Sequence, residues 1–213
     1  MSTIAIIDYG MGNLHSIGKA LEHVAEKHRI IITNEHQALK QADKIVFPGV
    51  GAIRDCMHEL KKQSLNELII QLSQEKPFLG ICLGMHALMD NSDENDGIQC
   101  LAIFKGHVKK FTDGLIDENT QEKLKIPHMG WNQVHHQNNH VLWNDIKQDS
   151  RFYFVHSYYV TLDNSTDECA TTNYPTAFSS VIARDNLFAV QFHPEKSQHD
   201  GLQLLQNFTN WTI

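Results

Sequence analysis

The sequence predicts an α/β fold, in which a central and mainly parallel sheet is flanked by helices and the second half of the chain is β-rich. Two observations carry this prediction. Short apolar runs alternate with segments of helical periodicity up to about residue 81, and strand-like segments dominate from about residue 106. No repeat, linker or low-complexity segment interrupts the 213 residues. We therefore expect a single domain over residues 1–213.

The first half contains four apolar runs of the length of buried strands, at residues 4–7, 30–32, 44–47 and 78–81. Between them, apolar side chains recur at helical spacing over residues 14–25. A short helix is expected at 36–42, and a longer one from about residue 52 towards residue 74. This β-α-β order is typical of a parallel sheet wrapped by helices.

The second half is predicted to consist of strands and one closing helix. Strands are expected at residues 107–111, 131–135, 151–162, 169–174 and 178–192. The residues Arg184, Asp185 and Asn186 interrupt the last of these segments and predict a hairpin turn. Leu202, Leu205 and Phe208 then recur at helical spacing near the end of the chain.

Composition narrows the class of protein. The net charge is −7 and no run of Lys or Arg occurs, which argues against nucleic acid as a partner. No apolar stretch is long enough to span a membrane, and the first residues lack the pattern of a signal peptide. The four cysteines are widely spaced without a Cys-x-x-Cys pair, which favours reduced thiols. We expect a cytoplasmic protein without nucleic-acid or membrane partners.

Cys82 is the candidate nucleophile. It lies in the segment 80–84, Gly-Ile-Cys-Leu-Gly, between an apolar strand and a helix-like stretch. This is the cysteine counterpart of the Gly-x-Ser-x-Gly nucleophile elbow, a sharp strand-to-helix turn that exposes the reactive side chain. The neighbouring helix N-terminus favours a thiolate. The other cysteines, Cys56, Cys100 and Cys169, have no such flanks and are expected to be inert core residues.

His193 and Glu195 are the candidate partners of that thiol. A thiol needs a base, because few free thiols are ionised at neutral pH. Being two residues apart, His193 and Glu195 are predicted to project from the same face of an extended chain. The carboxylate would then orient the imidazole and stabilise its charged form, as in a catalytic triad.

Two glycine-rich turns and several other histidines allow more than one interpretation. The segment 8–13 follows the first strand, but His15 replaces the third glycine of a dinucleotide fingerprint. The turn Gly49-Val50-Gly51 either offers backbone N–H groups to an oxyanion or is an ordinary βα turn. His156 either lines the pocket or is a core residue. His135, His136 and His140 lack accompanying ligands, so no metal site is expected.

Taken together, these residues resemble the class I glutamine amidotransferases with a Cys-His-Glu triad. More narrowly, the chain is similar to the family of glutaminase subunits of imidazole glycerol phosphate synthase. The resemblance extends over essentially the whole chain. It is carried by the segments 8–14, 47–51, 80–85, 126–132, 152–158 and 190–197. It implies the amidotransferase fold, a flavodoxin-like α/β arrangement.

The resemblance also implies a role for each candidate residue. The nucleophile is Cys82, the base and acid is His193, and the orienting carboxylate is Glu195. The remaining roles fall on three groups: an oxyanion hole from Leu83 and the turn Gly49, Val50 and Gly51; glutamine contacts from Gly51, His86, Ser157 and Tyr158; and a partner interface or ammonia route at Asn13, Trp131 and Lys196. No metal and no organic cofactor is implied.

The implied function is hydrolysis of L-glutamine to glutamate and ammonia through a thioester on Cys82. Ammonia would pass to a (β/α)8-barrel cyclase of the HisF type, bound as a heterodimer. That partner would form imidazole glycerol phosphate and aminoimidazole-carboxamide ribonucleotide in histidine biosynthesis. The family's oxyanion hole is thought to reorient when the partner is loaded.

One residue departs from the family pattern. The family usually has Gln where this chain has His86, and imidazole has a shorter reach and a charge that varies near neutral pH. Altered affinity for glutamine or altered pH dependence is therefore expected. The departure also leaves open an alternative, a paralogous glutaminase that serves a surface-polysaccharide amidotransferase. A non-catalytic regulatory or scaffold protein is a further alternative, disfavoured because no triad member is missing.

Overall fold

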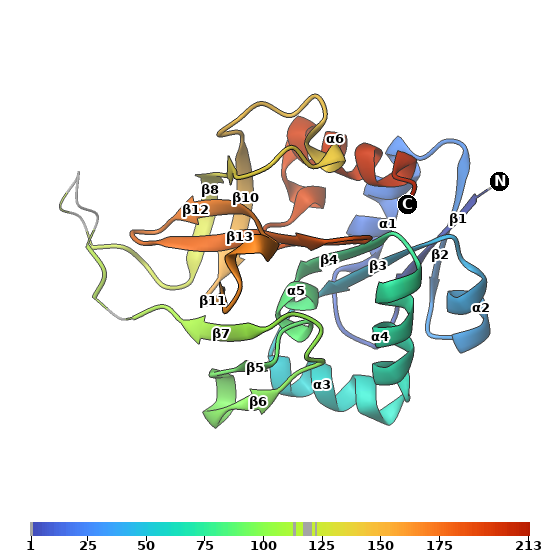
Figure 1. Ribbon diagram of the computed structural model, residues 1–213, viewed down its shortest axis with the longest axis horizontal. Coiled ribbons are helices and arrows are strands. Elements are labelled where there is room, and N and C mark those ends of the chain that lie inside the picture. Colours follow the sequence, from blue (N-terminus) through green and yellow to red (C-terminus); the bar gives the residue numbers. More distant parts are fainter. Residues whose placement is uncertain (1, 113, 117–120, 122) are drawn as a thin grey trace.

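Figure 1 shows the computed structural model, which describes residues 2–112, 114–116, 121 and 123–213. Among these residues, twelve strands form one large sheet and two strands form a small second sheet. The main path through the large sheet runs β2-β1-β3-β4-β14-β13-β11-β7-β5-β6, with β12 and β9 branching from β13. The architecture is the predicted α/β fold.

The half of the large sheet that holds the N-terminal strands is parallel. It consists of β2 (His28–Thr33), β1 (Ser2–Ile7), β3 (Lys44–Gly49), β4 (Phe78–Cys82) and β14 (Leu187–Val190). Because parallel strands end at the same edge of a sheet, the loops after β1, β3, β4 and β14 gather there.

Helices cover both faces of this parallel region (Figure 1). One face carries α2 (His36–Gln41), α3 (Ile53–Lys62), α4 (Leu65–Glu75) and the short α5 (Leu83–Ala87). The other carries α1 (Leu14–Val24) and α6 (Gln198–Asn210), which pack on each other. Successive strand residues point to opposite faces, so strands covered on both sides need continuous apolar runs. In β1, the side chains of Ala5 and Ile7 pack on the face covered by α2–α5. Those of Ile4 and Ile6 pack on the face covered by α1 and α6.

Antiparallel strands extend the sheet beyond β14. They are β13 (Ala177–Arg184), β11 (Tyr158–Leu162), β7 (Gly106–Lys110), β12 (Glu168–Asn173) and the two-residue β9 (His135–His136). At the end of the sheet, the two-residue β5 (Asn91–Ser92) pairs with β7 in parallel, and β6 (Ile98–Gln99) pairs with β5 antiparallel. The small sheet pairs β8 (His128–Gln133) with β10 (Arg151–His156). Single 3-10 turns lie at Glu94–Asp96, Val141–Trp143, Ser165–Asp167 and Pro194–Lys196.

The predicted element types are confirmed, including the hairpin between β13 and β14, whose turn places Asp185 at a φ of 53°. The single helix predicted from about residue 52 towards residue 74 is wrong. Ser64 adopts a left-handed φ of 56° and separates α3 from α4. No glycine or proline marks the break. The preceding Gln63 donates its side-chain amide to the backbone oxygen of Tyr9, a contact that only the folded chain provides.

The single strand predicted at residues 151–162 is also wrong. The chain bends at Ser157 and passes from the small sheet, where β10 lies, to the large sheet, where β11 lies. The backbone N–H of Phe111 donates to the carbonyl of Ser157 at 3.0 Å, which secures the crossing point. A hydrophobic pattern cannot reveal such a bend, because both halves alternate in the same way.

Within the described residues, none of the helices has both the length and the apolar character needed to cross a membrane.

Candidate active site

Cys82 lies at the end of β4, where the chain turns into α5. Its backbone has φ 54° and ψ −109°, a conformation that a non-glycine residue rarely adopts. The flanking glycines allow the close packing of this turn. A Cβ on Gly84 would lie 2.0 Å from the carbonyl oxygen of Phe47 on β3, and one on Gly80 would lie 3.0 Å from the Cβ of Ala189. The predicted elbow is therefore present, and Cys82 is buried with 7% of its surface exposed.

A cavity of about 340 Å³ opens beside Cys82. Seven other predicted site residues line it: Val50, Gly51, Leu83, His86, Ser157, Tyr158 and His193. Three residues that the sequence analysis did not assign to a site also line it, namely Glu94, Pro127 and Val155, together with His156, for which the sequence left a pocket and a core position open. Residues from both halves of the chain meet here. The cavity therefore lies at the carboxyl edge of the parallel strands, where ligands bind in open α/β sheets.

His193 and Glu195 form the predicted contact by a different route from the one expected. Nδ1 of His193 lies 2.9 Å from Oε1 of Glu195, and both side chains are nearly fully buried. The two residues are not on an extended strand, because Pro194–Lys196 forms a 3-10 turn. Lys196 N–H donates to the carbonyl of His193 at 3.0 Å, and the Ser197 hydroxyl donates to the same carbonyl at 2.6 Å. This turn brings the carboxylate back to the imidazole.

The electrostatic surroundings of His193 favour its charged form. Burial by itself would lower its pKa, but the Cys82 charge beside it and the Glu195 carboxylate together raise the pKa to about 10. Its Nε2 is buried and has no hydrogen-bond partner among the residues that the structure describes. With Nδ1 donating to Glu195, this free Nε2 is the atom that can exchange a proton with a molecule in the cavity.

Gln191 connects the nucleophile to His86. Its Nε2 donates towards the Cys82 sulfur at 3.9 Å, and its Oε1 lies 2.7 Å from Nε2 of His86. Because an amide oxygen only accepts, the His86 Nε2 carries the proton. Burial lowers the pKa of His86 to about 4, so the imidazole is neutral near pH 7. The expectation that its charge varies near neutral pH is wrong. The sequence analysis missed Gln191. β14 and the residues up to His193 are buried at every position, so no pattern along this segment distinguishes Gln191.

The glycine turn after β3 lies next to the nucleophile. Gly49 pairs with Cys82 across β3 and β4, and Gly51 has a left-handed φ of 100°. A Cβ on Gly49 would lie 2.3 Å from the Tyr9 hydroxyl and 2.9 Å from the Cβ of Leu83. Gly49 itself is not among the cavity-lining residues. The turn can approach the elbow this closely only because Gly49 has no side chain.

The residues predicted at the partner interface lie outside the cavity. Asn13 is exposed and accepts the backbone N–H of Ser16 at 3.4 Å, as an N-cap of α1. Trp131 is 37% exposed and meets the ring of Tyr153 edge-on, with centroids 6.1 Å apart. The Lys196 ammonium lies 5.9 Å from the same ring. Trp131 and Lys196 therefore share one exposed surface around Tyr153.

The remaining cysteines behave as the sequence indicated. Burial raises the pKa of Cys56 and of Cys100 to about 12, and that of Cys169 to about 11. All four cysteines are free thiols. The described part of the chain contains no group of three or more His, Cys, Asp or Glu side chains that could bind a metal ion.

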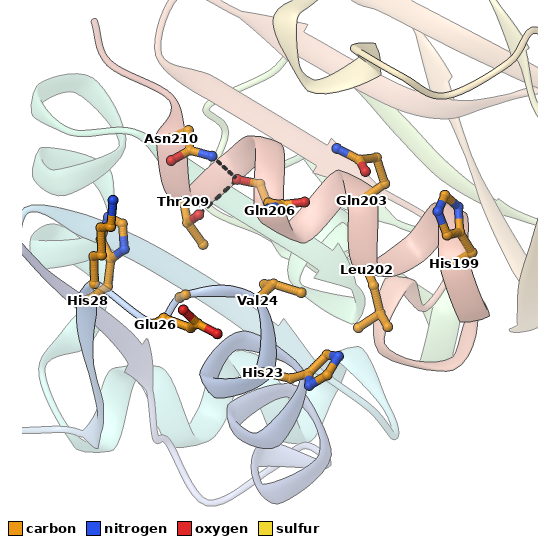
Figure 2. A pocket seen from close by; sticks show the side chains of 12 residues that line it. His23, Val24, Glu26, His28, His199, Leu202, Gln203, Gln206, Thr209 and Asn210 are labelled. Carbon is orange, nitrogen blue, oxygen red and sulfur yellow. Dashed lines mark hydrogen bonds between the residues drawn. The ribbon is translucent and has the colours of Figure 1, made fainter.

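A larger hollow of about 530 Å³ lies between the end of α1 and α6 (Figure 2). His23, Glu26, His28 and His199 are among its lining residues, and no cysteine and no predicted site residue is. The hydrogen bonds drawn there, from Thr209 and Asn210 to the Gln206 backbone, are internal to α6. Size alone therefore does not identify the site, and the smaller cavity is the candidate because Cys82 and His193 line it.

Comparisons with known proteins identify one family. The family model "Glutamine amidotransferase class-I" matches residues 5–211. The imidazole glycerol phosphate synthase subunit HisH of Nitrosococcus oceani is 54% identical over 211 residues, covering 99% of this chain and 98% of the relative. The HisH of Acinetobacter baylyi is 53% identical over 215 residues and covers both chains fully.

Solved structures support the fold. The chain is similar to the structure of PurLQS from Thermotoga maritima, with a TM-score of 0.75 and 15% identity over 98% of each chain. It is also similar to a GMP synthase protein from Thermoplasma acidophilum, with a TM-score of 0.69 and 20% identity, covering 99% of this chain and 93% of the other.

Proposed function

The chain belongs to the class-I glutamine amidotransferase family, among the HisH subunits of imidazole glycerol phosphate synthase, and from this premise we propose how its site works. It hydrolyses L-glutamine to glutamate and ammonia through a thioester on Cys82. The observation that carries the proposal is the arrangement of the cavity. A cysteine at a strained elbow, a buried imidazole with a free Nε2 and a carboxylate on its Nδ1 meet there.

The thiolate of Cys82 attacks the carboxamide carbon, and the carbonyl electron pair moves to the oxygen. Collapse of this tetrahedral intermediate breaks the C–N bond, and the proton on Nε2 of His193 passes to the leaving nitrogen. Ammonia departs and a thioester remains. Water then attacks the thioester and gives its proton to Nε2, after which the C–S bond breaks to release glutamate. Glu195 holds the imidazole in one orientation and stabilises its charged form throughout.

Backbone donors are proposed to bind the charge that develops on the oxygen. The Leu83 N–H directly follows Cys82 at the start of α5, and the turn Gly49-Val50-Gly51 begins at Gly49, which pairs with Cys82 across β3 and β4. Fixed N–H groups of this kind lower a barrier because they need little reorientation. Gly51 and the backbone of Ser157 and Tyr158 hold the amino-acid end of glutamine, which fits their position along the cavity. His86 acts on this site through Gln191.

Ammonia is proposed to pass directly to a cyclase partner. Free ammonia would be protonated and lost in water, which favours its direct transfer to an acceptor site. The names of the relatives indicate imidazole glycerol phosphate synthase. The exposed surface around Trp131 and Lys196, and Asn13, are proposed to face that partner. A (β/α)8 barrel that forms imidazole glycerol phosphate and aminoimidazole-carboxamide ribonucleotide fits this role.

The test measures glutamate release with and without the cyclase partner and its ligand. Cys82→Ala should abolish glutamine-dependent turnover and leave ammonia-dependent synthesis by the complex intact. Cys100→Ala is the matched control, because this buried thiol lies outside the cavity, and it should retain glutaminase activity. Glutamate release by the Cys82→Ala variant would sink the assignment of the nucleophile.

Two further parts of the proposal concern the whole chain. We propose one domain over residues 1–213, supported by the family match over residues 5–211 and by the large sheet that contains strands of both halves. We also propose a reducing, cytoplasmic location, because the chemistry needs Cys82 as a free thiol. The alternative role in surface-polysaccharide synthesis has no specific support, since His86 keeps its hydrogen bond to Gln191 within the cavity wall.

A further inference from the structure

Two buried histidines beside the cavity take part in none of these steps. His128 on β8 and His156 on β10 are opposite each other in the register of the small sheet. Nδ1 of His128 lies 2.9 Å from Nε2 of His156. Their exposed fractions are 3% and 6%, so the protein itself must satisfy their ring nitrogens.

The contact of His156 with a backbone carbonyl determines which nitrogen of each ring carries the proton. Nδ1 of His156 lies 2.8 Å from the carbonyl oxygen of Tyr158. A carbonyl only accepts, so this Nδ1 carries a proton. In a neutral ring the Nε2 of His156 is then an acceptor, and the proton between the rings belongs to Nδ1 of His128. Nε2 of His128 is consequently an acceptor as well.

A side-chain amide at the other end requires the same order. Nδ2 of Asn132 lies 3.3 Å from Nε2 of His128. The orientation of this amide is fixed by the backbone, because Nδ2 also donates to the carbonyl of Asn173 at 3.0 Å and Oδ1 accepts the Gln133 N–H at 2.8 Å. An extra proton on either ring would bring two donors face to face. Both ends of the chain of hydrogen bonds therefore require neutral rings.

The surroundings keep the rings neutral. His128 is stacked between Tyr174 and Phe154, with centroids 3.8 Å and 5.0 Å away. The other titratable groups of the cavity are Cys82, His86, Glu94, Tyr158 and His193. Burial lowers the pKa of His128 to about 4 and that of His156 well below its usual value. For His156, the neighbouring His128, His86 and His193 add to this effect.

The chain of hydrogen bonds from Asn132 through His128 to His156 ends where β10 passes into β11. The imidazole of His156 binds the carbonyl two residues on, and the Phe111 N–H binds the Ser157 carbonyl between them. These two contacts set the direction of the Ser157–Tyr158 peptide at the cavity wall. The other end of this chain of hydrogen bonds, at His128 and Asn132, lies on β8, where Asn132 follows the exposed Trp131.

We propose that His128 and His156 are positioning residues, a proton-ordered relay that holds the Ser157–Tyr158 backbone in place for the amino-acid end of glutamine. The assignment of that ligand rests on the proposed function. Neither histidine exchanges a proton with substrate in this scheme. Their loss weakens glutamine binding and leaves the chemical step on Cys82 intact.

The first test needs no substrate. In protein labelled with ¹⁵N at histidine, the ring signals of His128 and His156 are assigned by their loss in the His128→Asn and His156→Gln variants. We expect a protonated Nδ1 and an unprotonated Nε2 on both rings, without titration between pH 6 and pH 8. A proton on Nε2 of either ring, or a titration in that range, overturns the relay.

The second test separates glutamine binding from chemistry in the complex with the cyclase partner. His128→Phe keeps an aromatic ring against Tyr174 but removes the Nδ1 donor. We expect the KM for glutamine to rise about fivefold to tenfold, the effect of one lost hydrogen bond, with kcat within about twofold. His128→Asn restores a donor near the position of Nδ1 and should recover part of the loss.

The matched control is His136→Phe, which replaces a histidine stacked on Trp143 at 3.9 Å outside the cavity and should leave KM unchanged. Iodoacetamide labelling of Cys82 at an unchanged rate shows that the elbow of each variant is intact. A fall in kcat with unchanged KM overturns the positioning role. If the wild-type complex releases no glutamate, the proposed function fails, and the ring signals still decide whether the relay exists.

Discussion

The sulfur of Cys82 has one neutral and one charged neighbour. Gln191 offers an amide N–H at 3.9 Å, and its orientation depends on the Nε2–H of His86. His193 is charged and is held by Glu195. We infer that His86 influences Cys82 through Gln191, in addition to lining the cavity itself.

Substitutions at His86 should differ according to whether they keep a donor. In His86→Leu the Oε1 of Gln191 is left buried without its partner, at a cost of about 1–3 kcal/mol. We expect kcat/KM for glutamine to fall at least about tenfold. His86→Gln supplies an amide N–H and should stay within about threefold of the wild type. Steady-state glutamate release by the complex measures both, and equal losses in the two variants would contradict the contact with Gln191.

Removing the Glu195 charge should change the pH profile. The carboxylate raises the pKa of His193, so Glu195→Gln lowers it. An imidazole that has lost its proton cannot protonate the leaving ammonia, and the alkaline limb of kcat should therefore move to lower pH. We also expect kcat at pH 8 to fall at least about tenfold. An alkaline limb at the wild-type position would show that Glu195 does not control the base.

At the scale of elements, the elbow depends on how closely α5 approaches β3. The first turn of α5 lies against the Phe47 carbonyl, and a methyl group on Gly84 would come within 2.0 Å of that oxygen. Backbone atoms on both sides cannot move apart without separating β3 from β4, which are paired along five positions. The same packing that permits the elbow therefore also aligns the glycine turn with Cys82.

Gly84→Ala should consequently destabilise the protein by about 3 kcal/mol, the upper range for overpacking. Gly18→Ala is the control, because this glycine lies within α1 and its added Cβ would meet Ile32 Cδ1 at an ordinary 3.4 Å. Alanine is the better helix former there, so stability should be equal or up to about 1 kcal/mol higher. Urea unfolding compares the two. A Gly84→Ala protein as stable as the wild type would contradict the close approach.

Element boundaries illustrate what local patterns can and cannot predict. The strands and α1 could be predicted from the order of apolar residues. Strands covered on both faces need continuous apolar runs, and a helix that covers a sheet needs apolar residues at helical spacing. The break at Ser64 and the bend at Ser157 were missed, since each depends on contacts with distant residues, Tyr9 and Phe111. The contact between His193 and Glu195 was anticipated, but its 3-10 turn was not.

At the scale of the whole molecule, buried histidines link stability to pH. Burial lowers the pKa of His86, His128, His136 and His140 to about 4, against about 6.5 in an unfolded chain. Between these values the unfolded state binds more protons than the folded state. The stability that these four histidines contribute is therefore fully present above about pH 6.5 and is lost as the pH falls towards 4.

We expect the free energy of unfolding to drop by several kcal/mol between pH 7 and pH 5, measured by urea titration at each pH. His136→Phe removes one of these groups and should make the dependence on pH less steep. The same variant serves as the control for the relay, since His136 lies outside the cavity. A protein equally stable at pH 7 and pH 5 would show that these rings are not held neutral by burial.

The sequence by itself determined the α/β order, the elbow at Cys82, the His-Pro-Glu segment and the family. The first three depend on chain geometry over a few residues, such as periodicity, turn strain and the spacing of two side chains, and the family follows from the resemblance of segments along the whole chain. The tertiary structure alone decided which histidines are neutral and which atoms hold their protons. Those properties depend on burial and on contacts between positions far apart in the chain, such as Gln191 with Cys82 and His128 with His156. A local pattern carries no information on such pairs, because folding determines which distant groups share a low-dielectric interior.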